Sequence, residues 1–225
     1  MMKDRAYQLH HKLVGLCPMR RQKVMAGEHA FNVWSACNLD PLLEALSQKP
    51  SDHPDVMDER LPYWAELWPS ASVMAETILS RPPPKATRWL ELGCGPGLAG
   101  VAASRIGIPG IWTDYMREAL WLAELNAMEE GVQNPETMLL DWREPPENLR
   151  VPWILTSDVA YEVRNFGPLL DCFDALLEPK GEIWFGEPGR PVAKDFFDHL
   201  DAAGWTWESL LQVGKISVYR LRRAA

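Results

Sequence analysis

Short apolar runs alternate with amphipathic stretches over most of the chain after residue 68. Five apolar runs predict strands at 88–92, 110–114, 137–142, 153–158 and 182–186. The stretches between and around them predict helices at 70–79, 98–106, 117–130, 166–177 and 191–203. Two further runs, 205–212 and 215–221, are expected to form an antiparallel pair. The pattern predicts an α/β fold with a doubly wound, Rossmann-like sheet of seven strands, mostly parallel, with an antiparallel C-terminal hairpin.

The first part of the chain follows a different pattern. We expect residues 1–62 to form an N-terminal helical extension, ahead of the α/β domain at 63–225. The extension begins with a basic stretch that is typical of a solvated helical arm. Asp40 is suited to cap a helix whose first residue is Pro41. Residues 49–60 are polar and contain two prolines, so they predict an exposed loop.

Composition narrows the class of protein. The 225 residues are 47% apolar, enough for a substantial core, and the net charge is −8. This charge argues against nucleic acid or an anionic membrane as a general partner, and no apolar run approaches the length of a membrane span. The four cysteines are scattered without a CxxC pair, and the histidines have no metal-ligand spacing. We therefore expect a cytoplasmic protein with reduced thiols and no metal site.

Glycines at alternate positions follow the strand at 88–92. Gly93, Gly95 and Gly97 surround Cys94, and a helix is predicted directly after them. A strand, a tight glycine loop and a helix in this order begin many nucleotide-binding α/β domains, because the backbone must turn sharply and approach the ligand closely. Together with Gly100, the spacing also satisfies the dinucleotide fingerprint, so an NAD site is an alternative at this point.

Acidic residues lie at the ends of four predicted parallel strands: Glu91, Asp114, Asp141 and Asp158. Carboxyl ends of such strands meet at one crevice, where ligands bind. A carboxylate at Glu91, just before the glycines, favours a cofactor with a cationic group over a pyrophosphate. Asp141 offers an acceptor for an adenine amino group, and Trp142 offers a ring to stack on it.

The segment 61–69 holds three aromatic residues, Tyr63, Trp64 and Trp68. Two interpretations are open: a hydrophobic plug between the extension and the main domain, or a wall over the ligand cleft, because aromatic faces bind flat rings and cations. The proline run at 81–85 predicts a stiff linker before the first strand of the sheet.

The sequence ELGCGPG at 91–97 resembles motif I of the class I S-adenosylmethionine-dependent methyltransferases, and the resemblance covers about residues 61–222. Three further segments resemble the seven-β-strand protein lysine methyltransferases, in particular the group of the electron transfer flavoprotein β-subunit lysine methyltransferase. They are PYWAELWP at 62–69, DVAYE at 158–162 and GEPGRP at 186–191. One departure is Ala160, where that group usually has a bulky side chain.

The resemblance implies an enzyme that transfers methyl groups from S-adenosylmethionine to lysine side chains of a protein partner, without a metal. It implies that Asp158 and Tyr161 face the acceptor. It implies a cofactor site formed by Trp68, Glu91, Gly93, Cys94, Gly95, Gly97, Asp114, Tyr115, Asp141, Trp142 and Ser157. Two alternatives stay open: a methyltransferase acting on a small molecule, and a non-catalytic binding protein on the same fold.

Overall fold

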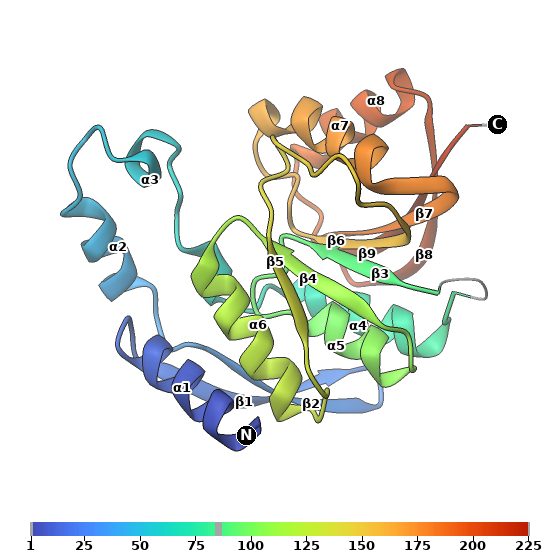
Figure 1. Ribbon diagram of the computed structural model, residues 1–225. Helices are drawn as coiled ribbons and strands as arrows, with labels where there is room; N and C mark the ends of the chain where they lie inside the picture. Colours follow the sequence, from blue (N-terminus) through green and yellow to red (C-terminus); the bar gives the residue numbers. More distant parts are fainter. Residues whose placement is uncertain (1, 84–86, 225) are drawn as a thin grey trace.

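The computed structural model describes residues 2–83 and 87–224, and its centre is one seven-stranded sheet (Figure 1). The strand order is β5-β4-β3-β6-β7-β9-β8, and neighbours are parallel except that β9 is antiparallel to β7 and β8. The strands are β3 (Trp89–Leu92), β4 (Gly110–Asp114), β5 (Glu136–Leu139), β6 (Val151–Ser157), β7 (Leu177–Glu187), β8 (Trp205–Val213) and β9 (Ile216–Arg223). The predicted fold class, a mostly parallel sheet with an antiparallel C-terminal hairpin, is confirmed.

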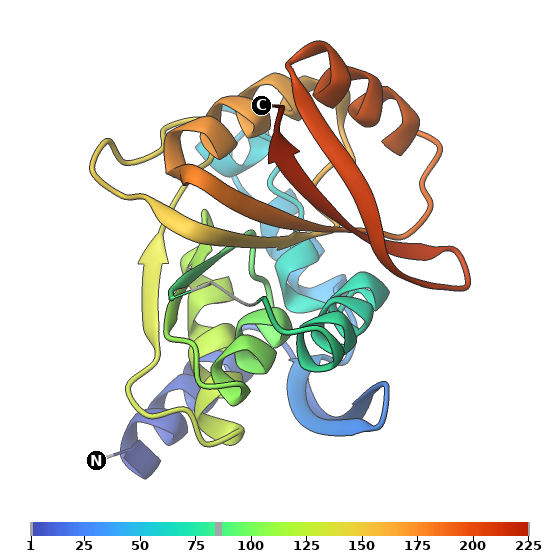
Figure 2. The same cartoon turned by 90° about the vertical axis from the view of Figure 1, so that its right-hand side faces the viewer.

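Helices cover both faces of this sheet (Figures 1 and 2). One face carries α4 (Pro69–Ser80), α5 (Leu98–Arg105) and α6 (Arg117–Glu129), and the other carries α7 (Phe166–Leu176) and α8 (Ala193–Ala202). Side chains of a strand point alternately to the two faces. Trp89 accordingly packs in the core beneath α5, while its neighbour Leu90 packs in the core beneath α7. Both faces of such a strand are buried, which explains why neighbouring positions such as Trp89 and Leu90 are both apolar.

The extension is not wholly helical, which corrects the expectation for residues 1–62. It consists of α1 (Met2–Val14), a hairpin of β1 (Met19–Ala26) and β2 (His29–Ala36), then α2 (Asp40–Ser47) and α3 (Pro54–Met57). The hairpin forms because Gly27 and Glu28 make a two-residue turn between strands whose inward positions are apolar. The boundary of the domain at residue 63 stays a prediction.

The beginning of the chain is also more firmly packed than a solvated arm. Leu9 and Leu13 of α1 are fully buried against α6, and Phe31 of β2 is fully buried in the core beneath α4 and α5. Hydrophobic burial thus fixes α1 and the hairpin to the layer of helices that contains α4, α5 and α6.

The α2–α3 segment, residues 40–60, is different. Neither helix contains a buried residue, and both helices project from the body of the molecule (Figure 1). The loop expected at 49–60 includes the short helix α3, which His53 caps by accepting a hydrogen bond from the backbone N–H of Asp55 (3.1 Å). We refer to residues 40–60 as the arm. Two short 3-10 helices, η1 (Tyr63–Ala65) and η2 (Val163–Asn165), complete the set of elements in the described residues.

The linker expected at 81–85 lies partly outside the described residues, which exclude 84–86. In the remainder of the chain, no helix is long and apolar enough to cross a membrane.

Candidate active site

A cavity of about 430 Å³ lies at the carboxyl ends of β3, β4 and β6. After β3 the chain first adds β4 and β5 on one side of β3, and then adds β6 on its other side. Such a switch point is where α/β sheets bind their ligands. The sequence analysis placed thirteen residues at the site, and ten of them line this cavity: Trp68, Gly93, Cys94, Gly95, Asp114, Tyr115, Trp142, Ser157, Asp158 and Tyr161. Glu91, Gly97 and Asp141 are not among its described lining residues.

The glycine loop needs its glycines for two separate reasons. Gly97 has a φ of 77°, and a Cβ there would lie 2.8 Å from both Ala123 Cβ and the Trp112 ring. At Gly95 the φ is 47° and a Cβ would lie 3.3 Å from the backbone oxygen of Trp64. The loop therefore combines left-handed backbone geometry with close packing against α6 and η1, and only glycine satisfies both.

Glu91 stabilises this loop from below. Its Oε2 accepts a hydrogen bond from the backbone N–H of Gly100 (2.8 Å), in the first turn of α5. A carboxylate at this position satisfies a helix N–H that has no partner within the helix. Burial raises the pKa of Glu91 to about 8. The structure thus gives Glu91 a role in shaping the loop, and its direct contact with a cofactor stays a prediction.

Asp114 connects the end of β4 to the same loop. Its Oδ2 accepts a hydrogen bond from the backbone N–H of Gly95 (3.1 Å), and its Oδ1 accepts one from Met116 (2.9 Å). Burial raises the pKa of this carboxyl to about 6, against the opposing effect of these backbone donors. Since Asp114 also lines the cavity, its carboxylate has acceptor positions suited to ribose hydroxyls.

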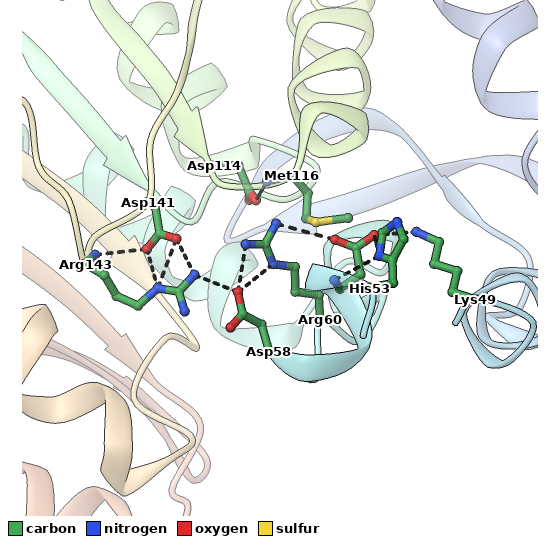
Figure 3. Close-up of polar contacts among 9 residues, drawn as sticks. Lys49, His53, Asp58, Arg60, Asp114, Met116, Asp141 and Arg143 are labelled. Carbon is green, nitrogen blue, oxygen red and sulfur yellow. Dashed lines mark hydrogen bonds and ion pairs between the residues drawn. The ribbon is translucent and has the colours of Figure 1, made fainter. Parts of the chain in front are cut away.

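Two aromatic rings face the cavity beside Asp114. The ring centroids of Tyr115 and Trp142 are 6.3 Å apart, with planes inclined by 34°. These flat apolar surfaces are suited to a nucleobase. Asp141 lies just outside, in an adjoining cavity of about 190 Å³ that Tyr115 and Trp142 also line. Its carboxylate is held by Arg143, whose Nε lies 2.9 Å from Oδ1 (Figure 3).

The opposite side of the cavity contains Asp158, which directly follows β6. Its backbone has a φ of 62°, a left-handed conformation that is uncommon outside glycine and that occurs at functional sites. The side chain is only 7% exposed, and Arg190 Nη2 lies 3.0 Å from its Oδ1. Burial raises the pKa of Asp158, and the charge of Arg190 partly opposes that rise. The hydroxyl and the backbone N–H of Ser70, in the first turn of α4, also face this carboxylate and lower its pKa, although no donor among the described residues reaches either oxygen in well-aligned geometry.

Arg190 was not counted among the predicted site residues, although a loop-stabilising ion pair with Glu187 and a contact with the substrate protein were both possible roles for it. It lines the cavity and pairs with Asp158, while the Glu187 carboxylate accepts a hydrogen bond from the Arg190 backbone N–H (2.6 Å). The GEPGRP segment after β7 contains Arg190 and marks it as a candidate. The sequence alone could not show that the guanidinium contacts Asp158, directly after β6. The parallel pairing of β6 and β7 places Ser157 beside Gly186, which brings the two segments together.

Aromatic side chains form the wall above Asp158. The ring of Tyr63 lies edge-on to Trp68 (centroids 5.6 Å apart) and to Tyr161 (5.9 Å apart), and Trp68 Nε1 donates a hydrogen bond to the Tyr63 backbone oxygen (2.9 Å). Trp64 is instead buried and packs with the cluster between α1 and α6. The segment 61–69 therefore combines the two interpretations, the hydrophobic plug and the wall of the cleft. Trp64 packs the extension against the domain, and Tyr63 and Trp68 line the cavity.

Comparison with known proteins places this geometry in a family. A family model described as "Lysine methyltransferase" matches residues 58–203, more than half of the chain. The histone-arginine methyltransferase METTL23 of Xenopus laevis is 29% identical over 158 residues, which cover 66% of this chain and 63% of that one. The electron transfer flavoprotein beta subunit lysine methyltransferase of Xenopus laevis is 30% identical over 138 residues, covering 57% and 53%. The ribosomal protein L11 methyltransferase of Shewanella woodyi is 30% identical over 97 residues, covering 42% and 31%.

The matches therefore span less than two thirds of each of these relatives. Among solved structures, a 16S rRNA N2 G1207 methyltransferase of T. thermophilus in complex with AdoMet and guanosine superposes with a TM-score of 0.59 at 14% identity, covering 92% of this chain and 51% of that one. A ribosomal protein L11 methylase of Lactobacillus delbrueckii superposes with a TM-score of 0.58 at 17% identity, covering 68% and 77%. These similarities show the fold.

The sheet, the glycine loop and the matches together define a class I S-adenosylmethionine-dependent methyltransferase. Within that class, the chain belongs to the lysine methyltransferase family whose model matches residues 58–203.

The residues around the cavity fit this cofactor. When bound, S-adenosylmethionine supplies a methyl group on a positively charged sulfur. Asp114 would hold the ribose hydroxyls, and Tyr115 and Trp142 would contact adenine, because the cavity presents a carboxylate next to two flat rings. Within residues 2–83 and 87–224, no group of three or more His, Cys, Asp or Glu side chains is arranged to hold a metal ion.

Proposed function

We propose that this protein methylates the side-chain amine of lysine in a protein substrate. The observation that carries the proposal is the Asp158 carboxylate, which is buried in the cavity wall beside Arg190 and Ser70 and keeps lone pairs that no well-aligned hydrogen bond from the described residues occupies. A buried carboxylate of this kind is a binding site for an ammonium group, which donates hydrogen bonds in three directions. Arg190 balances part of its charge and fixes its orientation.

The aromatic wall complements this carboxylate. Tyr63, Trp68 and Tyr161 present ring surfaces and edges to the same space, and aromatic faces attract cations. Burial raises the pKa of Tyr161 to about 12, so the phenol stays neutral and keeps its proton as a hydrogen-bond donor. The chain thus offers a lysine side chain an anionic contact at its tip and apolar rings along its stem.

Positioning is the main contribution that these residues would make to the reaction. A lysine amine reacts as a nucleophile only after it loses a proton, against a free pKa of about 10.4. Burial among the aromatic rings lowers that pKa because it disfavours the charged form, whereas the neighbouring Asp158 carboxylate raises it. The proton is released to water before the neutral amine takes the methyl group, and the sulfur leaves as a neutral thioether. Asp158 would then hold the amine in one orientation, and orientation alone is worth up to about 7–11 kcal/mol of the barrier in favourable cases.

Lysine is proposed over other acceptors for one further reason. The relatives include a lysine methyltransferase, a histone-arginine methyltransferase and a ribosomal protein methyltransferase, so sequence similarity by itself leaves the acceptor open. A carboxylate that is open on all sides can bind a planar guanidinium through both of its oxygens, in a bidentate contact. The Arg190 guanidinium already occupies one side of Asp158, which leaves room for a point-like cation.

The test is methyl transfer in a cell lysate. The enzyme is incubated with S-adenosylmethionine labelled in its methyl group, and the protein fraction is hydrolysed and analysed for methylated amino acids. We expect label in methyl-lysine. Label in methyl-arginine or methyl-histidine, or in low-mass material alone, would show that the assigned acceptor is wrong.

A pair of variants tests the role of Asp158. Asp158→Asn is expected to lower transfer at least about tenfold while binding of S-adenosylhomocysteine is kept, since orientation of the acceptor is lost and the cofactor side is intact. Asp171→Asn is the matched control, because Asp171 is an exposed aspartate on α7, outside the cavity lining. Equal rates for Asp158→Asn and the unmodified enzyme would remove Asp158 from the proposal.

A further inference from the structure

The arm, residues 40–60, reaches the cofactor side of the molecule through one carboxylate. Asp58 Oδ2 lies 2.8 Å from Arg60 Nη2 and 3.0 Å from Arg143 Nη2 (Figure 3). Arg60 belongs to the arm, and Arg143 belongs to the loop after β5. Asp58 therefore joins two parts of the chain that are 85 positions apart.

Arg143 extends this connection to the predicted adenine site. Its guanidinium donates hydrogen bonds to both oxygens of Asp141, with Nε 2.9 Å from Oδ1 and 3.0 Å from Oδ2. Its backbone N–H also donates to Oδ1 (3.0 Å). Through Arg143, the position of Asp58 thus affects the orientation of the Asp141 carboxylate.

Two other contacts hold the same segment against the cavity. The guanidinium carbon of Arg60 lies 5.3 Å from the ring centroid of Tyr115, which lines the cofactor cavity. Glu59 forms an ion pair with Arg164 of η2 (2.8 Å). Residues 58–60 therefore touch the loops after β4 and β5 and the η2 helix.

These contacts enclose the smaller cavity of about 190 Å³. Met57, Asp58 and Glu59 line it from the arm, and Asp141 and Trp142 line it from the sheet. Because Tyr115, Trp142 and Tyr161 line both cavities, the smaller one is a continuation of the cofactor site toward the arm.

Electrostatic contacts dominate this attachment. Neither α2 nor α3 has a buried residue. Leu42 of α2 is partly buried against the cluster between α1 and α6, and the ion pairs of residues 58–60 fix the other end of the arm. Charged contacts that are exposed to water weaken as salt increases, over a Debye length of roughly 10 Å at 0.1 M.

We propose that Asp58 is a positioning residue for S-adenosylmethionine: it clamps the arm over the adenine end of the cofactor site by bridging Arg60 and Arg143. The proposal rests on the cofactor-dependent activity and not on the choice of acceptor. Without this bridge, the outer wall of the smaller cavity separates from the sheet and Asp141 loses the neighbour that orients it through Arg143. The cofactor then binds more weakly and is released faster, while the acceptor side around Asp158 is unchanged.

The first test is calorimetric binding of S-adenosylhomocysteine to the full chain. Asp58→Ala is expected to raise the dissociation constant about two- to fivefold at about 0.05 M salt, the range for a small network of exposed ion pairs. Asp58→Glu keeps the charge and is expected to restore most of the affinity. Asp52→Ala is the matched control, since Asp52 is an exposed aspartate of the same segment and its removal changes the net charge equally.

The second test separates positioning from a general loss of charge. At about 0.5 M salt the unmodified enzyme is expected to approach the affinity of Asp58→Ala, because screening removes the same contacts. Hydrogen exchange of residues 49–60 is expected to slow when S-adenosylhomocysteine binds to the unmodified enzyme and to change little in Asp58→Ala. Equal affinity and equal exchange in the two proteins would overturn the proposal. Failure of the unmodified enzyme to bind S-adenosylhomocysteine would instead contradict its assignment as a methyltransferase.

Discussion

The guanidinium of Arg190 lies 3.0 Å from the carboxylate of Asp158, so the segment after β7 closes over the residue that ends β6. Both side chains are largely buried at the cavity wall, with exposures of 24% and 7%. The pair links the two halves of the acceptor side: the left-handed residue after β6 and the turn that follows β7.

Removal of Arg190 should therefore affect both stability and the pH dependence of activity. Arg190→Ala leaves a buried carboxylate without its counter-charge, and we expect a loss of about 1–3 kcal/mol in the free energy of unfolding, measured in urea. Because Arg190 lowers the pKa of Asp158, its removal raises that pKa and moves the acid limb of the activity profile to higher pH. Arg190→Lys keeps the charge and should show a smaller shift. An unchanged acid limb in Arg190→Ala would show that Asp158 does not titrate in the active form.

Glu91 should make the protein less stable as pH rises. Its pKa is raised from about 4.5 in the unfolded chain to about 8 in the folded protein, so between these values the folded state holds a proton that the unfolded state has released. The free energy of unfolding therefore falls with increasing pH, by up to about 1.4 kcal/mol per pH unit, until the folded group ionises. Asp114, whose pKa is raised to about 6, contributes in the same direction at lower pH.

Glu91→Gln isolates this effect in the window between about pH 6.5 and pH 8, where Asp114 is already ionised. Urea unfolding across the window should give a flatter dependence on pH for the variant than for the unmodified protein. A variant with the same slope would mean that Glu91 is ionised in the folded state over this whole range.

Gly97 and Gly107 allow backbone strain to be separated from crowding. Both have positive φ, 77° and 84°, but a Cβ at Gly97 would lie 2.8 Å from Ala123 and Trp112, whereas a Cβ at Gly107 has no described neighbour within 4 Å. Gly107→Ala should cost about 1 kcal/mol of stability from the backbone alone. Gly97→Ala should cost at least about 2–4 kcal/mol because it adds a clash in the core, and it should weaken binding of S-adenosylhomocysteine. Equal costs in thermal unfolding would mean that the loop moves to accommodate the methyl group.

Asn126 of α6 holds the N-terminal hairpin and the glycine loop together. Its Oδ1 accepts a hydrogen bond from Trp34 N–H (2.7 Å), and its Nδ2 donates to the backbone oxygens of Trp34 (3.1 Å) and Pro96 (2.9 Å). Asn126→Ala leaves buried backbone groups without partners, so we expect a loss of about 2–4 kcal/mol in urea unfolding. Gln133→Ala, at a residue whose side chain is exposed, is the control and should change stability by less than about 0.5 kcal/mol.

The sheet was predictable because its strands are buried on both faces. Successive positions such as 153–155 and 183–185 are then all apolar, and a helix must cover each face. The strand-end acids were predictable as a group for the same reason, since parallel strands place their carboxyl ends together. The cavity accordingly contains Asp114 and Asp158.

The remaining features depend on contacts between distant segments. Arg143 donates hydrogen bonds to Asp141, which lines the smaller cavity. No local pattern in the sequence predicts that pairing. The hairpin at 19–36 was missed because its outward positions are mostly charged or polar, and because two of the buried apolar residues on its inner face, Ala26 and Ala36, are small and only Phe31 and Val33 are larger. Arg190 was missed as a site residue because the register of β6 and β7, which brings it to Asp158, is a property of the assembled sheet.

The amide of Asn126 couples the N-terminal hairpin to the glycine loop. One side chain satisfies backbone groups of both the hairpin and the loop that begins α5. A ligand that orders this loop then makes transient detachment of residues 19–36 rarer. The coupling is reciprocal: an attached hairpin strengthens binding of that ligand by the same free energy. The rate at which a protease cuts the hairpin should therefore fall when the cofactor is bound, although Trp34 of the hairpin and Asn126 are more than ninety positions apart in the chain.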